Sequence, residues 1–198
     1  DIAVKWAKDA PPDFHARFSA SYRHYQYLLL AKDTEFRSNN ALFKNFVVYP
    51  GCKLDVDKMH NAAQCLLGIQ DFSAFRARRC QAKSPVRNMY GISVKKHSDY
   101  IVVDVMANAF LYNMVRNMVG ALCEVGANKR PESWIKEILD GKNREVVYKK
   151  MPANGLYLVG VGYPDFLEVD QLSHYNKIML TSDHLPLVYE PCSLCLID

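Results

Sequence analysis

Arg116 stands in an unusual sequence environment for a charged residue. Residues 108–126 read NAFLYNMVRNMVGALCEVG, and Glu124 is the only other charged side chain among them. A guanidinium does not release its proton, so in a covered position it needs a carboxylate, a phosphate or backbone oxygens to offset the loss of water. Arg116 is therefore a candidate for binding an anion. The alternative is an arginine whose head reaches solvent while its stem lies on apolar surface.

A helix is expected to position Arg116. Apolar residues recur at three- and four-residue spacing, which places them on one helical face. These residues are Leu111, Met114, Val115, Met118, Leu122 and Val125. We expect Asn108 to cap the first turn and Gly126 to end the last turn in the left-handed conformation. Arg116 projects from the opposite side, among uncharged neighbours, so that side is expected to be covered or to line a cleft.

Residues 14–27 combine aromatic rings with cations. Five rings alternate with Arg17, Arg23 and two histidines. Rings can stack on nucleobases while guanidiniums bind phosphates, so the segment is suited to a nucleic-acid surface. The alternative is a strand covered on both faces, whose rings belong to the core. The rings are Phe14, Phe18, Tyr22, Tyr25 and Tyr27.

Residues 76–87 form a second basic segment. It holds five basic side chains and no acid, and Ser84-Pro85 favours a loop. Cations at this density repel one another unless an anion is near, so we favour a loop that contacts phosphates over a merely solvated one. The basic residues are Arg76, Arg78, Arg79, Lys83 and Arg87.

The remaining pattern predicts an α+β fold. Alternation predicts a strand over residues 20–31, a hairpin over 87–96 and 100–107, and a last strand over 155–163. A short strand is expected around 46–49. Helices are expected from Asp55 or Asp57 to Gly68 and from near Pro131 to Gly141. This order predicts an antiparallel sheet with helices packed on one face.

Composition narrows the functional classes. The 198 residues are 49% hydrophobic, enough for one domain or a domain with a tail. The formal charge of +4 divides unevenly: residues 165–198 carry −5 and residues 1–164 carry +9, which favours a polyanionic partner. No run is long enough for a membrane span, and no signal pattern opens the chain, so we expect a cytoplasmic protein.

The six cysteines follow no disulfide framework, and reduced thiols fit them best. Cys192 and Cys195 form a single C-x-x-C pair, which without a second pair of ligands points only weakly to zinc. We therefore expect no metal. The chain begins with Asp1 rather than methionine, so we expect a segment to be missing upstream.

Four segments together resemble the TruA-type tRNA pseudouridine synthases. They are FHARFSA with R-x-Y-x-Y (14–27), G-x-x-D-F-x-x-F-R (68–76), ANAFLYNMVRNMVG (107–120) and GLYLV (155–159). They occur in this order over about 150 residues. Each segment alone is a weak signal, but the set in this order is specific.

The resemblance implies a pseudouridine synthase fold and a homodimeric isomerase. Such an enzyme converts uridine to pseudouridine in the anticodon stem-loop of tRNA, without a metal or organic cofactor. The family's nucleophile is an aspartate in an R-T-D-A-G segment that these residues lack. We therefore expect residues 1–13 to be a linker from a missing domain, 14–164 a C-terminal domain that is inactive alone, and 165–198 an acidic tail.

The resemblance also assigns roles to three positions. Tyr25 corresponds to the tyrosine that stacks on the target base, Arg116 to the arginine that pairs with the catalytic carboxylate, and Leu156 to the apolar wall of the pocket. Two positions depart from the family pattern: Asn113 replaces the usual histidine, and Gln26 replaces an arginine. A non-catalytic RNA-binding module and a segment used only for dimerisation are the alternatives.

Overall fold

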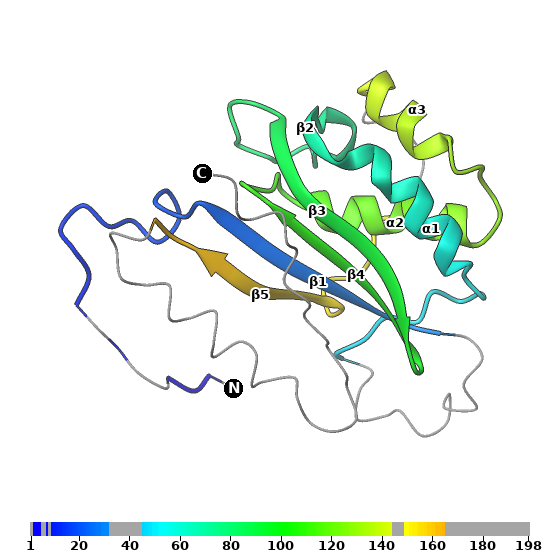
Figure 1. The fold of residues 1–198 in the computed structure, drawn as a ribbon, viewed down its shortest axis with the longest axis horizontal. Coiled ribbons are helices and arrows are strands. Elements are labelled where there is room, and N and C mark those ends of the chain that lie inside the picture. The colour runs from blue at the N-terminus through cyan, green and yellow to red at the C-terminus, as the bar shows by residue number, and fades with distance from the viewer. Residues whose placement is uncertain (1, 5–6, 8, 32–44, 144–148, 165–198) are drawn as a thin grey trace.

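The computed structural model describes residues 2–4, 7, 9–31, 45–143 and 149–164. Within these ranges the chain forms one five-stranded antiparallel sheet in the order β2-β3-β4-β1-β5. The predicted α+β class is confirmed. Figure 1 shows the helices grouped on the side of β2, β3 and β4, with β5 at the opposite edge. The elements are β1 (Tyr22–Leu30), α1 (Val56–Ala63), β2 (Gly68–Asp71), β3 (Val86–His97), β4 (Tyr100–Ala107), α2 (Met114–Gly126), α3 (Trp134–Gly141) and β5 (Leu156–Gly162).

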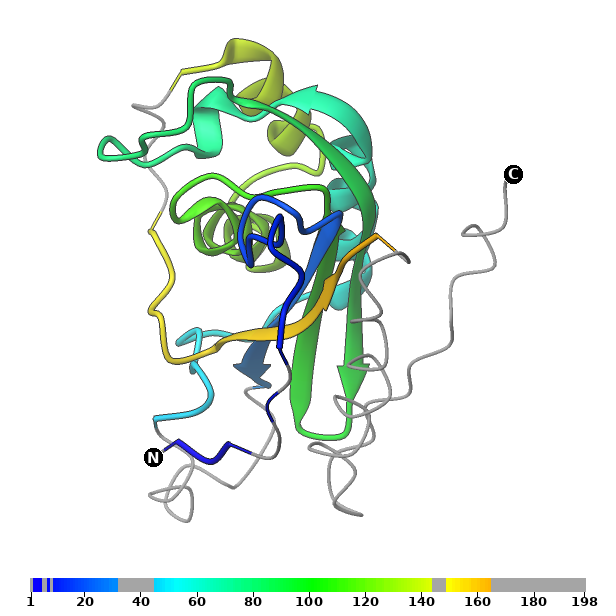
Figure 2. The same cartoon turned by 90° about the vertical axis from the view of Figure 1, so that its left-hand side faces the viewer.

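Alternation along the strands divides the sheet into two faces. In β1, Tyr27 and Leu29 belong to the main core, which also contains the buried side chains of all three helices. Leu28 and Leu30 point the other way and pack in a small cluster with Val102. This two-residue period explains why the strand could be predicted from its sequence. Figure 2 shows residues 14–21 and the β3–β4 turn at opposite ends of the sheet.

The helix that carries Arg116 begins later than predicted. α2 starts at Met114, and Asn113 precedes it with a left-handed φ of 59° and no side-chain cap. Asn108 does not cap this helix. Its Oδ1 accepts the Asn88 N–H at 3.0 Å, and its own N–H donates to Asn88 O at 3.1 Å. Asn108 therefore extends the β3–β4 pairing, because the chain is still leaving β4 at this position.

Gly126 ends α2, but not in the left-handed conformation that the sequence predicts. Among the described glycines, positive φ occurs only at Gly51 and Gly68, and the left-handed residue after α2 is Asn128. Gly126 instead permits close packing. A Cβ atom there would lie 2.7 Å from both Cγ and Sδ of Met59 on α1.

The helix expected from Asp55 or Asp57 to Gly68 begins as predicted but ends earlier, at Ala63. Asp55 caps α1 as expected, and its side chain accepts the N–H of Lys58 at 3.1 Å. Gly68 has φ 79° but opens β2, a four-residue strand that the sequence analysis did not predict. The short strand expected around residues 46–49 is a single bridge between Val48 and Leu29.

Some predictions fall on residues that the structure does not describe. The tail from 165 to 198, with Cys192 and Cys195, lies outside the described ranges. The four described cysteines, at positions 52, 65, 80 and 123, are free thiols. Among the described residues, no helix has the length and apolar character needed to cross a membrane.

Candidate functional site

Arg116 is half-buried and held by backbone and amide oxygens. Its Nε donates to Met151 O at 2.6 Å, and its Nη1 donates to Asn113 Oδ1 at 3.1 Å. The Met151 N–H returns a bond to Arg116 O at 3.3 Å. None of the carboxylates in the described ranges pairs with this guanidinium. Nε and Nη1 of the guanidinium are thus fixed, and Nη2 remains available for an anion.

Tyr27 connects Arg116 to the sheet. Its ring is fully buried, and its hydroxyl donates to Pro152 O at 2.7 Å. Burial raises the pKa of Tyr27 far above its ordinary value, Cys123 adds to the rise, and the positive charge of Arg116 opposes it. The phenol therefore stays neutral and keeps its hydrogen bond. Residues 151–152 are held by α2 on one side and by β1 on the other.

Tyr25 and Leu156 lie on the same face of the sheet as Tyr27. Leu156 is the register partner of Tyr27 in β5, and Tyr25 lies two residues along β1. Both side chains are partly exposed and pack against the main core. Phe110 meets the Tyr25 ring edge-on, with centroids 5.2 Å apart. Burial raises the pKa of Tyr25, and the charge of Arg23 opposes the rise.

These contacts bring the three predicted site residues to one side of the molecule. Tyr25 and Leu156 are related by strand register, and Arg116 is joined to them through Met151, Pro152 and Tyr27. A partly exposed ring beside an apolar side chain can hold a planar base. A fixed cation nearby can orient an anionic group. The arrangement suits stacking and charge pairing.

Arg23 and Arg17, predicted to bind RNA, have different surroundings. Arg23 Nη1 donates to Ala20 O at 2.8 Å and to Asn108 O at 2.7 Å, and its Nη2 donates to Arg17 O. Arg23 therefore fastens the segment before β1 to the end of β4. The Arg17 side chain is exposed and lies on the surface of that segment.

The basic loop is built by two of its arginines. Arg76 Nη2 donates to Cys80 O at 2.9 Å and to Ala82 O at 2.5 Å. Arg87 Nη1 donates to Ser84 O at 2.9 Å and to Val86 O at 2.6 Å. Burial lowers the pKa of Arg87, Cys80 opposes that shift, and the nearby charge of Arg76 adds to it.

Arg78 and Arg79 occupy the exposed part of the same loop. The loop therefore has a fixed shape and presents two cations to solvent. Arg76 and Arg87 hold that shape, whereas the side chains of Arg78 and Arg79 can reach a partner. Sequence reasoning grouped all four residues together because composition alone does not distinguish a supporting arginine from an exposed one.

Several residues that shape the site were not predicted. Phe110 and Met151 carry no signal in the sequence beyond their apolar character. Asn117 is 8% exposed, and its Nδ2 donates to Phe75 O at 2.8 Å. It anchors α2 to the turn before the basic loop. An amide beside an arginine, in a helix whose one other charged residue is Glu124, was the available signal.

A polar cluster on the opposite sheet face was also missed. Asp104 accepts hydrogen bonds at 2.8 Å from both His24 Nε2 and Gln26 Nε2. Gln26, one of the two departures from the family pattern, is thus bonded within the sheet. In the described ranges, no group of three or more His, Cys, Asp or Glu side chains could hold a metal ion.

The sequence is similar to known proteins over most of its length. The family model described as tRNA pseudouridine synthase matches residues 62–164. The tRNA pseudouridine synthase A of Escherichia fergusonii is 51% identical over 165 residues, and that of Escherichia coli K12 is 50% identical over the same length. Each alignment covers 83% of this chain and 60% of the relative.

The chain therefore spans about 60% of the length of the curated relatives that it matches. The family match covers α2, the basic loop and β5, which include Arg116 and Leu156. From this match, which extends over more than half of its residues, the chain belongs to the tRNA pseudouridine synthase family.

Proposed function

We propose that these 198 residues supply Arg116, Tyr25 and Leu156 to the active site of an enzyme that isomerises uridine to pseudouridine in tRNA. The observation that carries the proposal is the state of Arg116. It is half-buried, held by oxygens at Nε and Nη1, and paired with no carboxylate of the described residues. A cation fixed in this way is suited to receive one anionic partner.

The partner we propose is a catalytic aspartate from a segment outside these residues. Pairing with Arg116 would lower the pKa of that carboxyl and keep it ionised and oriented. Tyr25 would stack on the uracil after the nucleotide leaves its helix, at a cost of about a few kcal/mol that stacking and phosphate contacts offset. Leu156 would close the apolar side of the pocket.

The reaction then exchanges one glycosidic bond for another. The N1–C1′ bond breaks with assistance from the carboxylate, the uracil rotates, and a C5–C1′ bond forms. The proton on C5 is lost and N1 gains a proton, so the product is an isomer of the substrate. The neutral ring of Tyr25, whose pKa is raised by burial, provides a stacking surface without adding charge.

The wider biology is also part of the proposal. The substrate is the anticodon stem-loop of tRNA, the complete enzyme is a cytoplasmic homodimer, and these residues alone are inactive. The net charge of +9 over residues 1–164 supports a polyanionic substrate. The names of the relatives support tRNA as that substrate.

Substitution of Arg116 in the complete enzyme tests the proposal. Arg116→Met should lower the rate of pseudouridine formation about 100-fold or more, the magnitude expected when one electrostatic contact of an active site is removed. The affinity for tRNA should change little. Arg116→Lys should recover only part of the rate, because an ammonium cannot bond Met151 O and a carboxylate in the same planar geometry.

Lys136 provides the matched control. It is an exposed cation on α3, paired with Asp140 at 2.6 Å, and Lys136→Met should leave the rate unchanged. Full activity of Arg116→Met on tRNA would refute the assigned role.

A non-catalytic RNA-binding module is the second candidate. The exposed pair Arg78 and Arg79, on a loop held in shape by Arg76 and Arg87, favours it. This candidate predicts salt-sensitive binding of a tRNA stem-loop, with no isomerisation even by the complete protein. Formation of pseudouridine by the complete protein would exclude it.

A further inference from the structure

Phe18 is the most exposed aromatic side chain in the region that leads to the site. Its side chain is 75% exposed, whereas Tyr27 of the same sequence motif is fully buried. Phe14 packs on Tyr163 with ring centroids 5.1 Å apart, and Tyr25 packs on Phe110. The structure therefore separates the rings that serve the core from the one ring that faces outward.

Hydrogen bonds hold the loop that carries Phe18, so the ring is exposed on an ordered stretch of backbone. His15 Nδ1 accepts the N–H of Arg17 at 3.2 Å and of Phe18 at 3.3 Å. The His15 N–H donates to Ser19 Oγ at 3.0 Å, and the Ser19 N–H donates to His15 O at 2.9 Å. Four bonds within five residues fix the backbone on both sides of Phe18.

Further bonds fasten this loop to the rest of the molecule. The Tyr163 hydroxyl donates to Ala16 O at 2.9 Å, and the Ser21 N–H donates to Gly162 O at 2.8 Å. Arg23 joins Arg17 O to Asn108 O. Asn108 lies two residues before Phe110, the ring that contacts Tyr25. The Phe18 loop is thus tied to the segment that forms the edge of the candidate site.

The surroundings of the exposed ring are cationic and aromatic. The His15 ring lies 4.4 Å from the Phe18 ring, and Arg17 Cζ lies 5.5 Å from its centroid. Residues 14–21 contain no acidic side chain. An exposed aromatic face with a guanidinium beside it matches the surfaces on which single-stranded nucleic acids stack, since the ring takes a base and the cation takes a phosphate.

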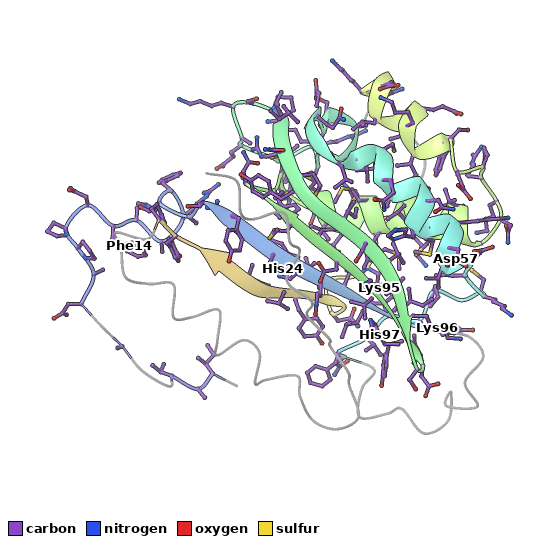
Figure 3. The ribbon with its side chains drawn as sticks, in the orientation of Figure 1. Phe14, His24, Asp57, Lys95, Lys96 and His97 are labelled. Carbon is purple, nitrogen blue, oxygen red and sulfur yellow. The ribbon has the colours of Figure 1, made fainter. Side chains whose placement is uncertain are left out.

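We propose that Phe18 is a stacking platform for an unpaired nucleobase next to the target uridine, with Arg17 binding the adjoining phosphate. This inference rests on the proposed function and adds a second base contact to it. Figure 3 places Phe14, at the start of this loop, at the end of the sheet opposite His97, so the platform lies away from the β3–β4 turn. A nucleobase is a better occupant than an apolar protein segment because the Arg17 guanidinium lies beside the ring.

The complete enzyme and tRNA provide the test. Phe18→Ala should weaken the binding of tRNA about tenfold, since one base–aromatic stack contributes about 1–3 kcal/mol. The Phe18→Leu variant should bind tRNA nearly as weakly as Phe18→Ala, because leucine keeps the apolar character but not the flat ring. Ile69→Ala is the control. Ile69 is 73% exposed on β2, and its loss should leave binding unchanged.

Phe18→Trp gives a direct readout of stacking. It should retain parental affinity, and its indole fluorescence should be quenched by tRNA beyond the change seen for the parental tryptophans. If Phe18→Ala lowers the melting temperature, weaker tRNA binding could come from lost stability. The fluorescence of the Phe18→Trp variant then decides whether the residue stacks on a base. Emission that tRNA does not change would overturn the platform, and blue-shifted emission before tRNA is added would assign Phe18 to a protein contact instead.

The outcomes also separate this inference from the proposed function. Suppose that the parental enzyme binds and isomerises tRNA. If the Phe18→Ala variant then binds tRNA as tightly as the parent, and tRNA does not quench the Phe18→Trp variant, only the platform is wrong. If the parental enzyme neither binds tRNA nor forms pseudouridine, the proposed function fails and the platform fails with it.

Discussion

Four arginines in the described ranges donate to backbone carbonyl oxygens, and they differ in where those bonds lie. Arg23, Arg76 and Arg87 each bond two or more carbonyls within or beside their own loop. Arg116 bonds one carbonyl and one amide oxygen and lies next to Tyr27, within reach of a partner from outside. The number of bonded nitrogens does not separate them, since Arg76 and Arg87 each use one and Arg116 uses two. Their positions do: Arg76 and Arg87 hold their own loop, whereas Arg116 lies beside Tyr27 and Met151 at the candidate site.

Cys80 should be more reactive at neutral pH than Cys65 and Cys123, which are also partly or fully buried. Burial acts to raise its pKa. The N–H groups of Tyr112 and Ala82, together with Arg76, outweigh that effect and lower the pKa below its ordinary value. The Tyr112 N–H lies 3.4 Å from Sγ. Burial raises the pKa of Cys65, and it raises that of Cys123 to about 12.

A lower pKa leaves a larger thiolate fraction at pH 7.5, and the thiolate is the reactive form. Alkylation of Cys80 by iodoacetamide should therefore begin to rise at a lower pH than that of Cys65. At pH 7.5 Cys80 should be alkylated well over tenfold faster than Cys123, because the two pKa values differ by more than about three units and Cys123 is buried. Peptide mapping by mass spectrometry measures these rates. Equal or faster labelling of Cys65 would contradict the prediction.

Helices and strands with a clear period could be predicted from the sequence, and their ends could not. β1, β3, β4 and β5 each run over seven or more residues, which is long enough for the sequence to predict a strand. β2 has only four residues and gives no period to read. The start of α2 was misplaced because Asn108 looks like a cap, yet its side chain bonds the neighbouring strand.

Arg116 could be selected as a candidate site residue from the sequence because it is a charged residue among uncharged neighbours. The roles of Tyr25 and Leu156 came from the family resemblance, and the structure supplied the register that relates them. Met151 and Pro152 contribute backbone oxygens, which no side-chain pattern reveals. Contacts made by the main chain are the part of a site that sequence reasoning misses.

A methyl group should be tolerated less at Gly126 of α2 than at Gly141 of α3. Gly126→Ala would place Cβ 2.7 Å from Met59 Cγ and Sδ and 3.3 Å from Asp55 O, so the buried Met59 side chain must repack or α1 and α2 must move apart. We expect the free energy of unfolding to fall by about 1–3 kcal/mol. Gly141 is the control, because no atom lies within 4 Å of a Cβ added there.

Gly141→Ala should leave stability unchanged or raise it by up to about 1 kcal/mol, since alanine favours the helix. Urea denaturation of both variants measures the difference. Equal stability of the Gly126→Ala and Gly141→Ala variants would show that the two helices have room to spare at their contact.

The charge distribution of the whole chain should govern how it meets RNA. Residues 14–21 and the basic loop lie toward the same end of the sheet, and the β3–β4 turn lies at the other end (Figures 1 and 2). Exposed cations at the first end, Arg17, Arg78 and Arg79, are candidates to contact phosphates. Arg76 and Arg87 would act indirectly, by holding the loop.

The salt dependence of tRNA binding tests this assignment. Removing a phosphate contact reduces the steepness with which log K falls against log salt by about 1. Arg78→Ala with Arg79→Ala should therefore flatten the slope by about 1–2 in the complete enzyme. Lys95→Ala with Lys96→Ala removes the same charge at the opposite end of the sheet (Figure 3) and should leave the slope unchanged. Equal slopes for both double variants would mean that net charge, rather than contact, governs binding.

The central claim is that Arg116 is one half of an ion pair completed by a segment outside these residues. A crystal structure of the complete enzyme measures this directly, as the distance from Arg116 Nη2 to the nearest carboxylate oxygen. We predict a distance of about 2.7–2.9 Å, as in charge-assisted hydrogen bonds, with the bonds to Met151 O and Asn113 Oδ1 retained. An Arg116 Nη2 with no carboxylate oxygen within about 6 Å, beyond the range at which an opposite charge shifts a pKa strongly, would contradict the account.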